Sequence, residues 1–247
     1  TARSGRAVQS PALLRADKVS GLRSLTLSTG FAGKVGAATG GLKEVARSEQ
    51  TISQAAQGSV DTLAQMAAAC KAGGSGVRVV NVSIPANTVV ARFEIFDRDT
   101  TEGTGNDLDL LLLNSAGATV ATSTNGGSNE AITVTTPAAG SYKVCAIGYE
   151  VANGVSTSFG LSSAVVTTAD KGGNLKATLP TKVYVGGSAT AGVSWSGLET
   201  GKRYLGGVVF LDGNNAAAST TVLSVETNNP LPLAVPSQRN VRADAKL

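Results

Sequence analysis

Histidine is absent from all 247 residues of the chain. It is the usual general base near neutral pH, so its absence excludes every Ser-His-Asp and Cys-His catalytic arrangement. The histidine-free alternative is a Ser-x-x-Lys dyad, and no serine in the sequence has lysine three residues further on. An enzyme built on carboxylates or lysine alone stays open, but we expect this chain to supply no catalytic residue.

Cysteine is scarce: Cys70 and Cys145 are the only two, and they belong to no C-x-x-C motif. Two cysteines without histidine cannot supply the four nitrogen and sulfur ligands of a usual zinc site. An even count fits one disulfide, and two buried free thiols are the alternative. We predict that Cys70 and Cys145 form a disulfide.

Aromatic residues make up 4% of the sequence and charged residues 15%, whereas hydrophobic residues reach 42%. This hydrophobic fraction can fill a core. The abundance of Gly, Ala, Ser, Thr, Val and Asn is typical of short strands joined by turns. No apolar run reaches the roughly 18 residues of a transmembrane helix. The basic start, Thr1 to Arg6, is not followed by the apolar region of a signal peptide, so we expect any export signal to lie upstream.

Polar and apolar residues alternate in short stretches along most of the chain, which predicts strands with one buried face. Turns separate these stretches at spacings of roughly ten residues, without amphipathic helices between them. The pattern predicts an all-β chain with two sandwiches of jelly-roll or immunoglobulin-like type. A short helix is expected only within 60–70. The predicted strands are 24–30, 34–39, 77–84, 88–96, 108–114, 119–124, 131–135, 141–149, 158–167, 175–179, 188–195, 203–211 and 220–226.

Cationic residues crowd the start of the chain, within a net charge of +4. They are Arg3, Arg6, Arg15, Lys18, Arg23 and Lys34. Proteins that bind nucleic acids combine a basic stripe with aromatic side chains for stacking, and these cations have no interleaved aromatics. We therefore interpret them as a solvated or interdomain surface and expect no nucleic-acid partner.

Acidic residues cluster in the middle of the chain. Asp107 and Asp109 share one face of a predicted strand because side chains alternate, and Asp97 and Asp99 precede them. Calcium takes roughly six to eight hard oxygen ligands, which these carboxylates could help to supply. The alternative is a solvated acidic rim. The sequence thus gives one candidate metal site, for calcium, at Asp97, Asp99, Asp107 and Asp109.

Four short motifs, taken in order, resemble the bacterial pre-peptidase C-terminal domain. They are Asn106-Asp107-Leu108-Asp109-Leu110, Asn114-Ser115-Ala116-Gly117, Asn125-Gly126-Gly127-Ser128-Asn129-Glu130 and Pro137-Ala138-Ala139-Gly140-Ser141-Tyr142-Lys143-Val144. Flanking segments are similar to the C-terminal regions of subtilisin-like serine proteases, among them Val8-Gln9-Ser10-Pro11 and Trp195-Ser196-Gly197-Leu198. The catalytic G-T-S-M-A motif of those proteases is absent.

The resemblance implies a β-sandwich appended to a secreted bacterial peptidase, often removed during maturation. Some collagen-binding relatives hold calcium, but no ligand set matches residue by residue here. We expect residues 1–20 to end a preceding fibronectin-like domain or linker, and 21–168 to form a sandwich of the pre-peptidase C-terminal type with an insertion at 44–76. Residues 174–227 should form a small immunoglobulin-like or fibronectin-like sandwich, and 228–247 a tail rich in proline.

We predict a non-catalytic accessory region of a secreted subtilisin-like serine protease that assists secretion, stability or substrate binding. Its expected partners are an upstream peptidase domain of the same precursor and a protein substrate, at the outer cell surface or beyond it. The alternative is a structural or adhesive module without a ligand. Tyr149 and Tyr184 are the candidates for contact with an extended polymer, and the alternative for both is packing inside the fold.

Overall fold

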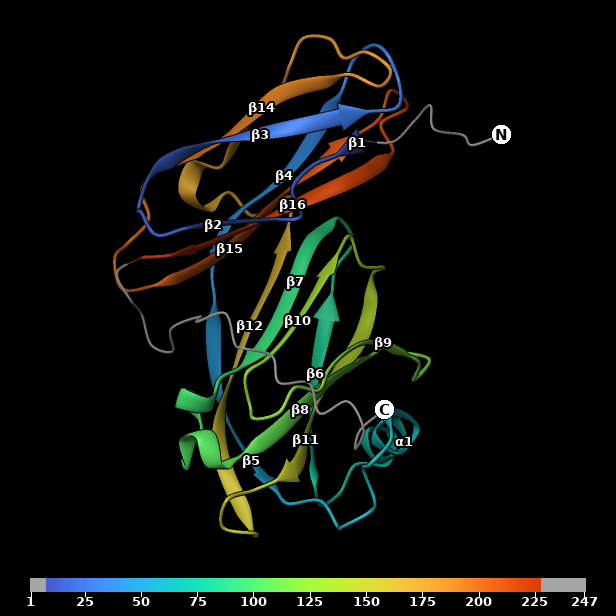
Figure 1. The fold of residues 1–247 in the computed structure, drawn as a ribbon, viewed down its shortest axis with the longest axis vertical. Coiled ribbons are helices and arrows are strands. Elements are labelled where there is room, and N and C mark those ends of the chain that lie inside the picture. The colour runs from blue at the N-terminus through green and yellow to red at the C-terminus, as the bar shows by residue number, and fades with distance from the viewer. Residues whose placement is uncertain (1–7, 228–247) are drawn as a thin grey trace.

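The computed structural model describes residues 8–227, whose strands form four sheets of four strands each. The sheets pair into two β-sandwiches that lie end to end along the long axis of the molecule (Figure 1). Every strand pair is antiparallel except β2 with β16. The predicted all-β class with two sandwiches is therefore confirmed.

The first sandwich, here called the terminal sandwich, is built from both ends of the described chain. One sheet has the strand order β1-β3-β14-β13, and the other has the order β2-β16-β15-β4. The strands are β1 (Val8–Gln9), β2 (Leu13–Ala16), β3 (Gly21–Thr29), β4 (Gly36–Glu44), β13 (Lys176–Thr178), β14 (Ser188–Trp195), β15 (Arg203–Leu211) and β16 (Ala217–Glu226).

The second sandwich, here called the inserted sandwich, is formed by the middle of the chain. Its sheets have the orders β10-β7-β12-β5 and β6-β11-β8-β9. The strands are β5 (Ala46–Ser53), β6 (Val77–Ile84), β7 (Thr88–Ile95), β8 (Asp107–Leu113), β9 (Thr119–Ser123), β10 (Glu130–Thr135), β11 (Gly140–Glu150) and β12 (Ser156–Thr167). Short 3-10 turns cover Asp97–Asp99, Gly103–Gly105 and Gly172–Asn174.

The order of the strands differs from the sequential domains that the sequence suggested. β3 pairs with β14 along eight residues, and β4 pairs with β15, so residues 8–44 share one sandwich with residues 176–226. β4 then leads into β5 with a single residue between them. The middle of the chain is thus inserted into the terminal sandwich. Alternation along a segment predicts a strand but does not identify its partner.

The expected insertion at 44–76 also contains a regular strand. β5 is an edge strand that pairs with β12, and most of its side chains are exposed. Such a polar edge strand lacks the apolar alternation from which strands are predicted. The predicted tail at 228–247 lies outside the described residues.

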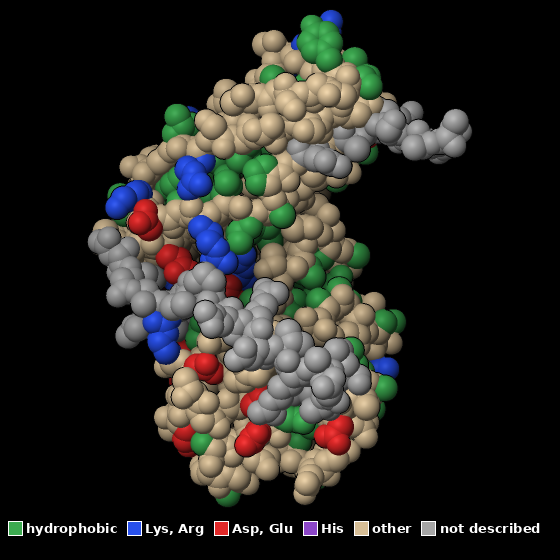
Figure 2. Space-filling model, in the orientation of Figure 1, with side chains coloured by type: hydrophobic (Ala, Val, Ile, Leu, Met, Phe, Trp, Pro, Cys, Tyr) green, Lys and Arg blue, Asp and Glu red, His purple; other side chains and the backbone are tan. Residues whose placement is uncertain are grey.

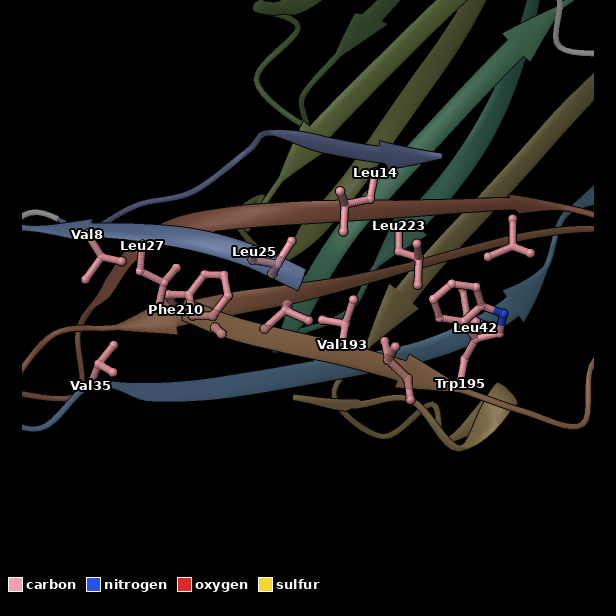
Figure 3. Packing of buried hydrophobic residues seen from close by; sticks show 14 of the residues in the cluster. Val8, Leu14, Leu25, Leu27, Val35, Leu42, Val193, Trp195, Phe210 and Leu223 are labelled. Carbon is pink, nitrogen blue, oxygen red and sulfur yellow. The ribbon is translucent and has the colours of Figure 1, made fainter. Parts of the chain in front are cut away.

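The core of the terminal sandwich lies between its two sheets (Figure 3). Leu25 and Leu27 on β3 face Phe210 on β15, and Trp195 closes one end. The indole Nε1–H of Trp195 donates to the carbonyl oxygen of Lys18 at 2.9 Å, which satisfies its one polar atom. Trp195 is therefore a core residue of the terminal sandwich. A Cβ at Gly21 would lie 2.5 Å from its ring, so only glycine fits opposite it.

The helix α1 (Leu63–Ala72) covers the outer face of the sheet β6-β11-β8-β9. Thr62 caps its first turn in a capping box with Gln65, and the chain leaves it at Gly73, which has a positive φ of 69°. Met66 and Cys70 are its buried residues. Cys70 is bonded to Cys145 in the central strand β11, with the two Cα atoms 5.9 Å apart. The predicted disulfide is confirmed, and it attaches the helix to the sheet.

We expect the disulfide to contribute substantially to stability because it closes a long loop, with 75 residues of sequence separation. The Cys70→Ala, Cys145→Ala double variant should lose about 2–4 kcal/mol of unfolding free energy. Urea titration of the oxidised protein and of this variant measures the loss. Equal midpoints, or two free thiols in the unfolded and unreduced protein, would contradict the assignment.

Candidate functional site

A groove of about 700 Å³ opens on the flank of the terminal sandwich, between the edge strands of its two sheets. Its walls are the end of β2, the turn after it and the start of β3, and Trp195 and the end of β16 close it. The lining residues are Arg15, Ala16, Asp17, Lys18, Ser20, Gly21, Leu22, Arg23, Trp195, Ser224 and Glu226. This volume is in the range of sites that hold small ligands or short peptide segments.

The groove has a fixed and cationic frame. Nη1 of Arg23 donates to the carbonyl oxygen of Arg15 at 2.7 Å, which bridges β3 and β2 across the flank. Lys18 is held at its backbone by Trp195, while its ammonium group is exposed and 4.0 Å from Asp17. Leu22 adds an apolar side chain that is 71% exposed. The groove therefore offers positive charge beside exposed apolar surface.

Charge divides between the two sandwiches. Residues 8–44 and 171–227 contain ten Lys and Arg against five Asp and Glu, whereas residues 45–170 contain six against eleven. On the face in Figure 2, Lys and Arg gather mainly over the terminal sandwich and the junction, and Asp and Glu over the inserted sandwich. The terminal sandwich thus carries a net charge of +5 and the inserted sandwich −5.

A buried ionic cluster joins the two sandwiches behind the groove. Glu94 on β7 lies between two arginines: its Oε2 is 2.6 Å from Nη2 of Arg203 on β15, and its Oε1 is 3.3 Å from Nε of Arg92. Arg203 also contacts Glu226 at 3.3 Å, and Arg92 donates to Ser224 at 3.2 Å. Glu94 and Arg203 are 6% and 8% exposed. Because Ser224 and Glu226 also line the groove, groove and cluster share a wall.

Burial acts on the charges of this cluster. Desolvation lowers the pKa of the Arg92 guanidinium, and the nearby Glu94 partly offsets that effect. An arginine nevertheless stays protonated in proteins. The guanidinium of Arg203 also lies over the ring of Phe96, 4.8 Å from its centroid. The cluster is therefore a set of charges that hydrogen bonds and an aromatic face hold in place.

Apolar contacts surround the cluster and define the junction. Val89, Val90 and Val166 of the inserted sandwich pack against Leu205 and Val209 of β15. Gly40 and Gly207 lie opposite each other on β4 and β15. A Cβ at either glycine would come within 2.8 Å of a valine methyl group of the inserted sandwich. The two glycines therefore allow the two sandwiches to approach closely.

The structure places the predicted calcium ligands in separate hydrogen-bonding roles. Asp97 accepts from the backbone N–H of Ser128 at 2.6 Å and from the side chain of Asn129 at 2.9 Å. Asp99 forms a bidentate ion pair with Arg47, whose Nε and Nη2 each donate to one carboxylate oxygen of Asp99 at 2.7 Å. These hydrogen bonds raise the pKa of the Arg47 guanidinium. Both carboxylates are thus bound by protein donors.

Asp107 and Asp109 are buried on β8, and Asp109 is 0% exposed. Within residues 8–227, no three His, Cys, Asp or Glu side chains lie together as a metal site would need. The contacts that are seen give a structural role to Asp97 and Asp99. The calcium site at Asp97, Asp99, Asp107 and Asp109 therefore stays an untested hypothesis from the sequence.

The motifs that resemble the pre-peptidase C-terminal domain supply hydrogen bonds that hold the loops of the inserted sandwich in place. Asn106 donates to Thr100 at 3.0 Å and accepts from the N–H of Ala152 at 3.0 Å. The hydroxyl of Tyr142 donates to the carbonyl of Ala138 at 2.7 Å. These residues fix loops against strands, so the motif pattern reports on the fold.

Of the two candidate tyrosines, Tyr149 packs against the apolar residues between α1 and its sheet. Tyr184 lies in the terminal sandwich and is 62% exposed. Nζ of Lys182 lies 5.2 Å from the Tyr184 ring centroid. Neither lines the groove. The groove residues Arg15, Lys18 and Arg23 belong to the cations that the sequence suggested as a solvated or interdomain surface. Their clustering was visible in the sequence, whereas the groove requires the pairing of strands.

Comparison with known proteins identifies part of the inserted sandwich. Residues 72–148, which span β6 to β11, match the family model described as the bacterial pre-peptidase C-terminal domain. The chain therefore contains a domain of the pre-peptidase C-terminal type. The match leaves out β5, β12 and the whole terminal sandwich.

No curated protein matches the chain. Among solved structures, tripeptidyl peptidase 2 is 11% identical with a TM-score of 0.33, and the alignment covers 94% of this chain but 20% of that one. A β-galacturonidase of glycoside hydrolase family 2 from Eisenbergiella tayi is 9% identical with a TM-score of 0.22, covering 75% of this chain and 44% of that one. The chain spans less than half of either protein. No helix within residues 8–227 is long and apolar enough to cross a membrane.

We expect the junction to depend on Glu94. Glu94→Gln leaves two buried arginines without their shared counter-charge, so the unfolding free energy should fall by about 3–5 kcal/mol. Glu44→Gln is the matched control, because it removes an exposed ion pair with Lys202 and should cost less than about 1 kcal/mol. Urea titration measures both. Similar losses for the two variants would show that the cluster does not support the junction.

We expect calcium to have little effect on stability, because protein donors already bind Asp97 and Asp99. An ion that binds only the folded state raises the melting temperature by mass action. Differential scanning calorimetry with calcium and with a chelator checks this. A melting temperature that falls on chelation, and that no longer responds in the Asp107→Asn, Asp109→Asn variant, would establish the calcium site instead.

Proposed function

We propose that this chain is a non-catalytic accessory region of a secreted bacterial peptidase. The observation that carries the proposal is the match of residues 72–148 to the pre-peptidase C-terminal domain. The absence of histidine fits this role, since the general base of a serine peptidase would lie in another part of the precursor. We further propose a subtilisin-like peptidase domain upstream, on the resemblance of the flanking segments.

Secretion is supported by two features. The disulfide between Cys70 and Cys145 fits an oxidising compartment, where such bonds persist. The resemblance to the pre-peptidase C-terminal domain also implies an exported bacterial protein. We therefore propose an extracellular location.

The accessory role that we favour is attachment to a protein substrate. An open, cationic and partly apolar groove on a rigid scaffold is a feature that a spacer does not need. Attachment raises the local concentration of substrate near a linked peptidase domain. The alternative, a rigid structural module without a ligand, is favoured by the buried ionic cluster at the junction, because it keeps the two sandwiches in one orientation.

Retention on insoluble protein tests the proposal. The purified chain should be retained on collagen, keratin or casein particles, should pass through chitin, and should hydrolyse none of them. The chain unfolded by reduction in urea serves as the control for nonspecific adsorption. Passage through every protein matrix, while the complete precursor is retained, would favour the structural module, and hydrolysis by the chain alone would overturn the accessory role.

A further inference from the structure

The strand β3 has one open edge within the described chain. On one side it pairs with β14 from Gly21 to Ser28. On the other side β1 pairs only with Ser28 and Thr29. The edge of β3 from Gly21 to Leu27 is therefore open on the flank of the sandwich, and its first residues, Gly21 to Arg23, line the groove.

The register shows which backbone groups reach that edge. The N–H of Thr29 donates to Gly187 on the β14 side, and Ser28 pairs with Gln9 on the β1 side. Backbone groups of an antiparallel strand alternate between its two sides. The N–H and C=O groups of Leu22, Ser24 and Thr26 therefore point toward the open flank. An extended chain could pair with them as an added strand.

The surroundings of this edge favour acidic side chains. Arg15, Lys18 and Arg23 line the groove, and the opposing Glu226 is 3.3 Å from Nε of Arg203. Asp17 is exposed and offers little screening of the three cations. The net charge of +5 on the terminal sandwich acts in the same direction over a longer range. Complementary charge in an incoming segment would raise its rate of association.

The same charges disfavour a second copy of the chain. Two β3 edges brought together would oppose Arg15 and Arg23 of one copy to those of the other. Like charges across an edge are a means by which proteins prevent edge-to-edge association. The occupant must therefore differ in charge from the edge itself.

We propose that the open edge of β3, flanked by Arg15, Lys18 and Arg23, binds an acidic, extended polypeptide segment as an additional strand. The inference rests on the proposed function, because it assigns the chemical class of the protein substrate that the accessory region holds. Main-chain hydrogen bonds to Leu22, Ser24 and Thr26 give the affinity. Arg15 and Lys18 select acidic side chains, and Leu22 accepts an apolar residue between them.

A fluorescent peptide that alternates valine and glutamate is the probe, and one that alternates valine and lysine is its control. Fluorescence anisotropy with the whole chain should show binding of the acidic peptide only, weakening as salt is added. Ser24→Pro should abolish binding because it removes an edge N–H that β14 does not use, while Ser24→Ala should leave binding unchanged.

Charge is tested separately. Arg15→Glu should weaken binding at least about tenfold. Lys176→Glu changes the net charge equally on β13, at the opposite edge of the same sheet, and should weaken binding less than about twofold. All variants should retain the melting temperature of the parent chain within a few degrees, and a variant that does not is replaced by Lys18→Glu.

Amide hydrogen exchange locates the peptide. Exchange at Leu22, Ser24 and Thr26 should slow when the acidic peptide is bound, with Arg23 and Leu25 unchanged, because their N–H groups already point toward β14. Binding without protection at these three amides, or equal binding of both peptides, would overturn the inference. If no peptide binds but the chain is still retained on insoluble protein, the β3 site fails while the proposed function stands. If the acidic peptide binds but the chain is not retained on insoluble protein, the β3 site stands while the proposed attachment function fails.

Discussion

The double burial of β15 is the constraint on which both sandwiches depend. Tyr204, Val208 and Phe210 enter the core of the terminal sandwich, whereas Leu205 and Val209 pack on the inserted sandwich. Burying side chains on both faces removes more apolar surface from water than an ordinary sandwich strand does. It also means that neither face of β15 can change without disturbing one of the two sandwiches.

Oppositely charged side chains from the two sandwiches meet at this junction. Glu94 and Arg203 are separated by 109 residues in the sequence, yet a 2.6 Å contact joins them across the two sandwiches. A buried ion pair adds little net stability compared with apolar residues of the same shape, because both charges lose their hydration. It does penalise any orientation in which the charges separate. The apolar contacts of β15 therefore supply the affinity between the sandwiches, and the ionic cluster selects one arrangement.

Much of this fold could be predicted from local pattern. The predicted stretches at 77–84, 188–195 and 203–211 coincide with β6, β14 and β15. In β14 every second residue is buried, whereas β15 is an apolar stretch buried on both faces. Local pattern could not give the pairing of β3 with β14, since the two strands are separated by the whole inserted sandwich. It also missed β5, whose mostly polar edge lacks a buried face.

The candidate site, like the fold, could be predicted from the sequence only in part. The cations Arg15, Lys18 and Arg23 were visible as a cluster in the sequence, but their common groove arises only when β2 and β3 become neighbouring edges of two sheets. In contrast, the acidic residues Asp97 and Asp99 were expected together and instead contact different partners, Asn129 and Arg47. Spacing along a chain predicts which residues share a strand face, whereas the loops that carry such carboxylates are placed by tertiary contacts.

The open edge of β3 has a cause in the first residues of the described chain. β1 runs beside β3 for two residues and then leaves it, because Ala12 accepts from the N–H of Val222 and Pro11 accepts from Thr221, both on β16. Proline has no N–H with which to continue the ladder along β3. The chain therefore passes from one sheet to the other and becomes β2. This switch closes the edge of β16 and opens the edge of β3, so the groove is a consequence of how the sandwich joins its two sheets.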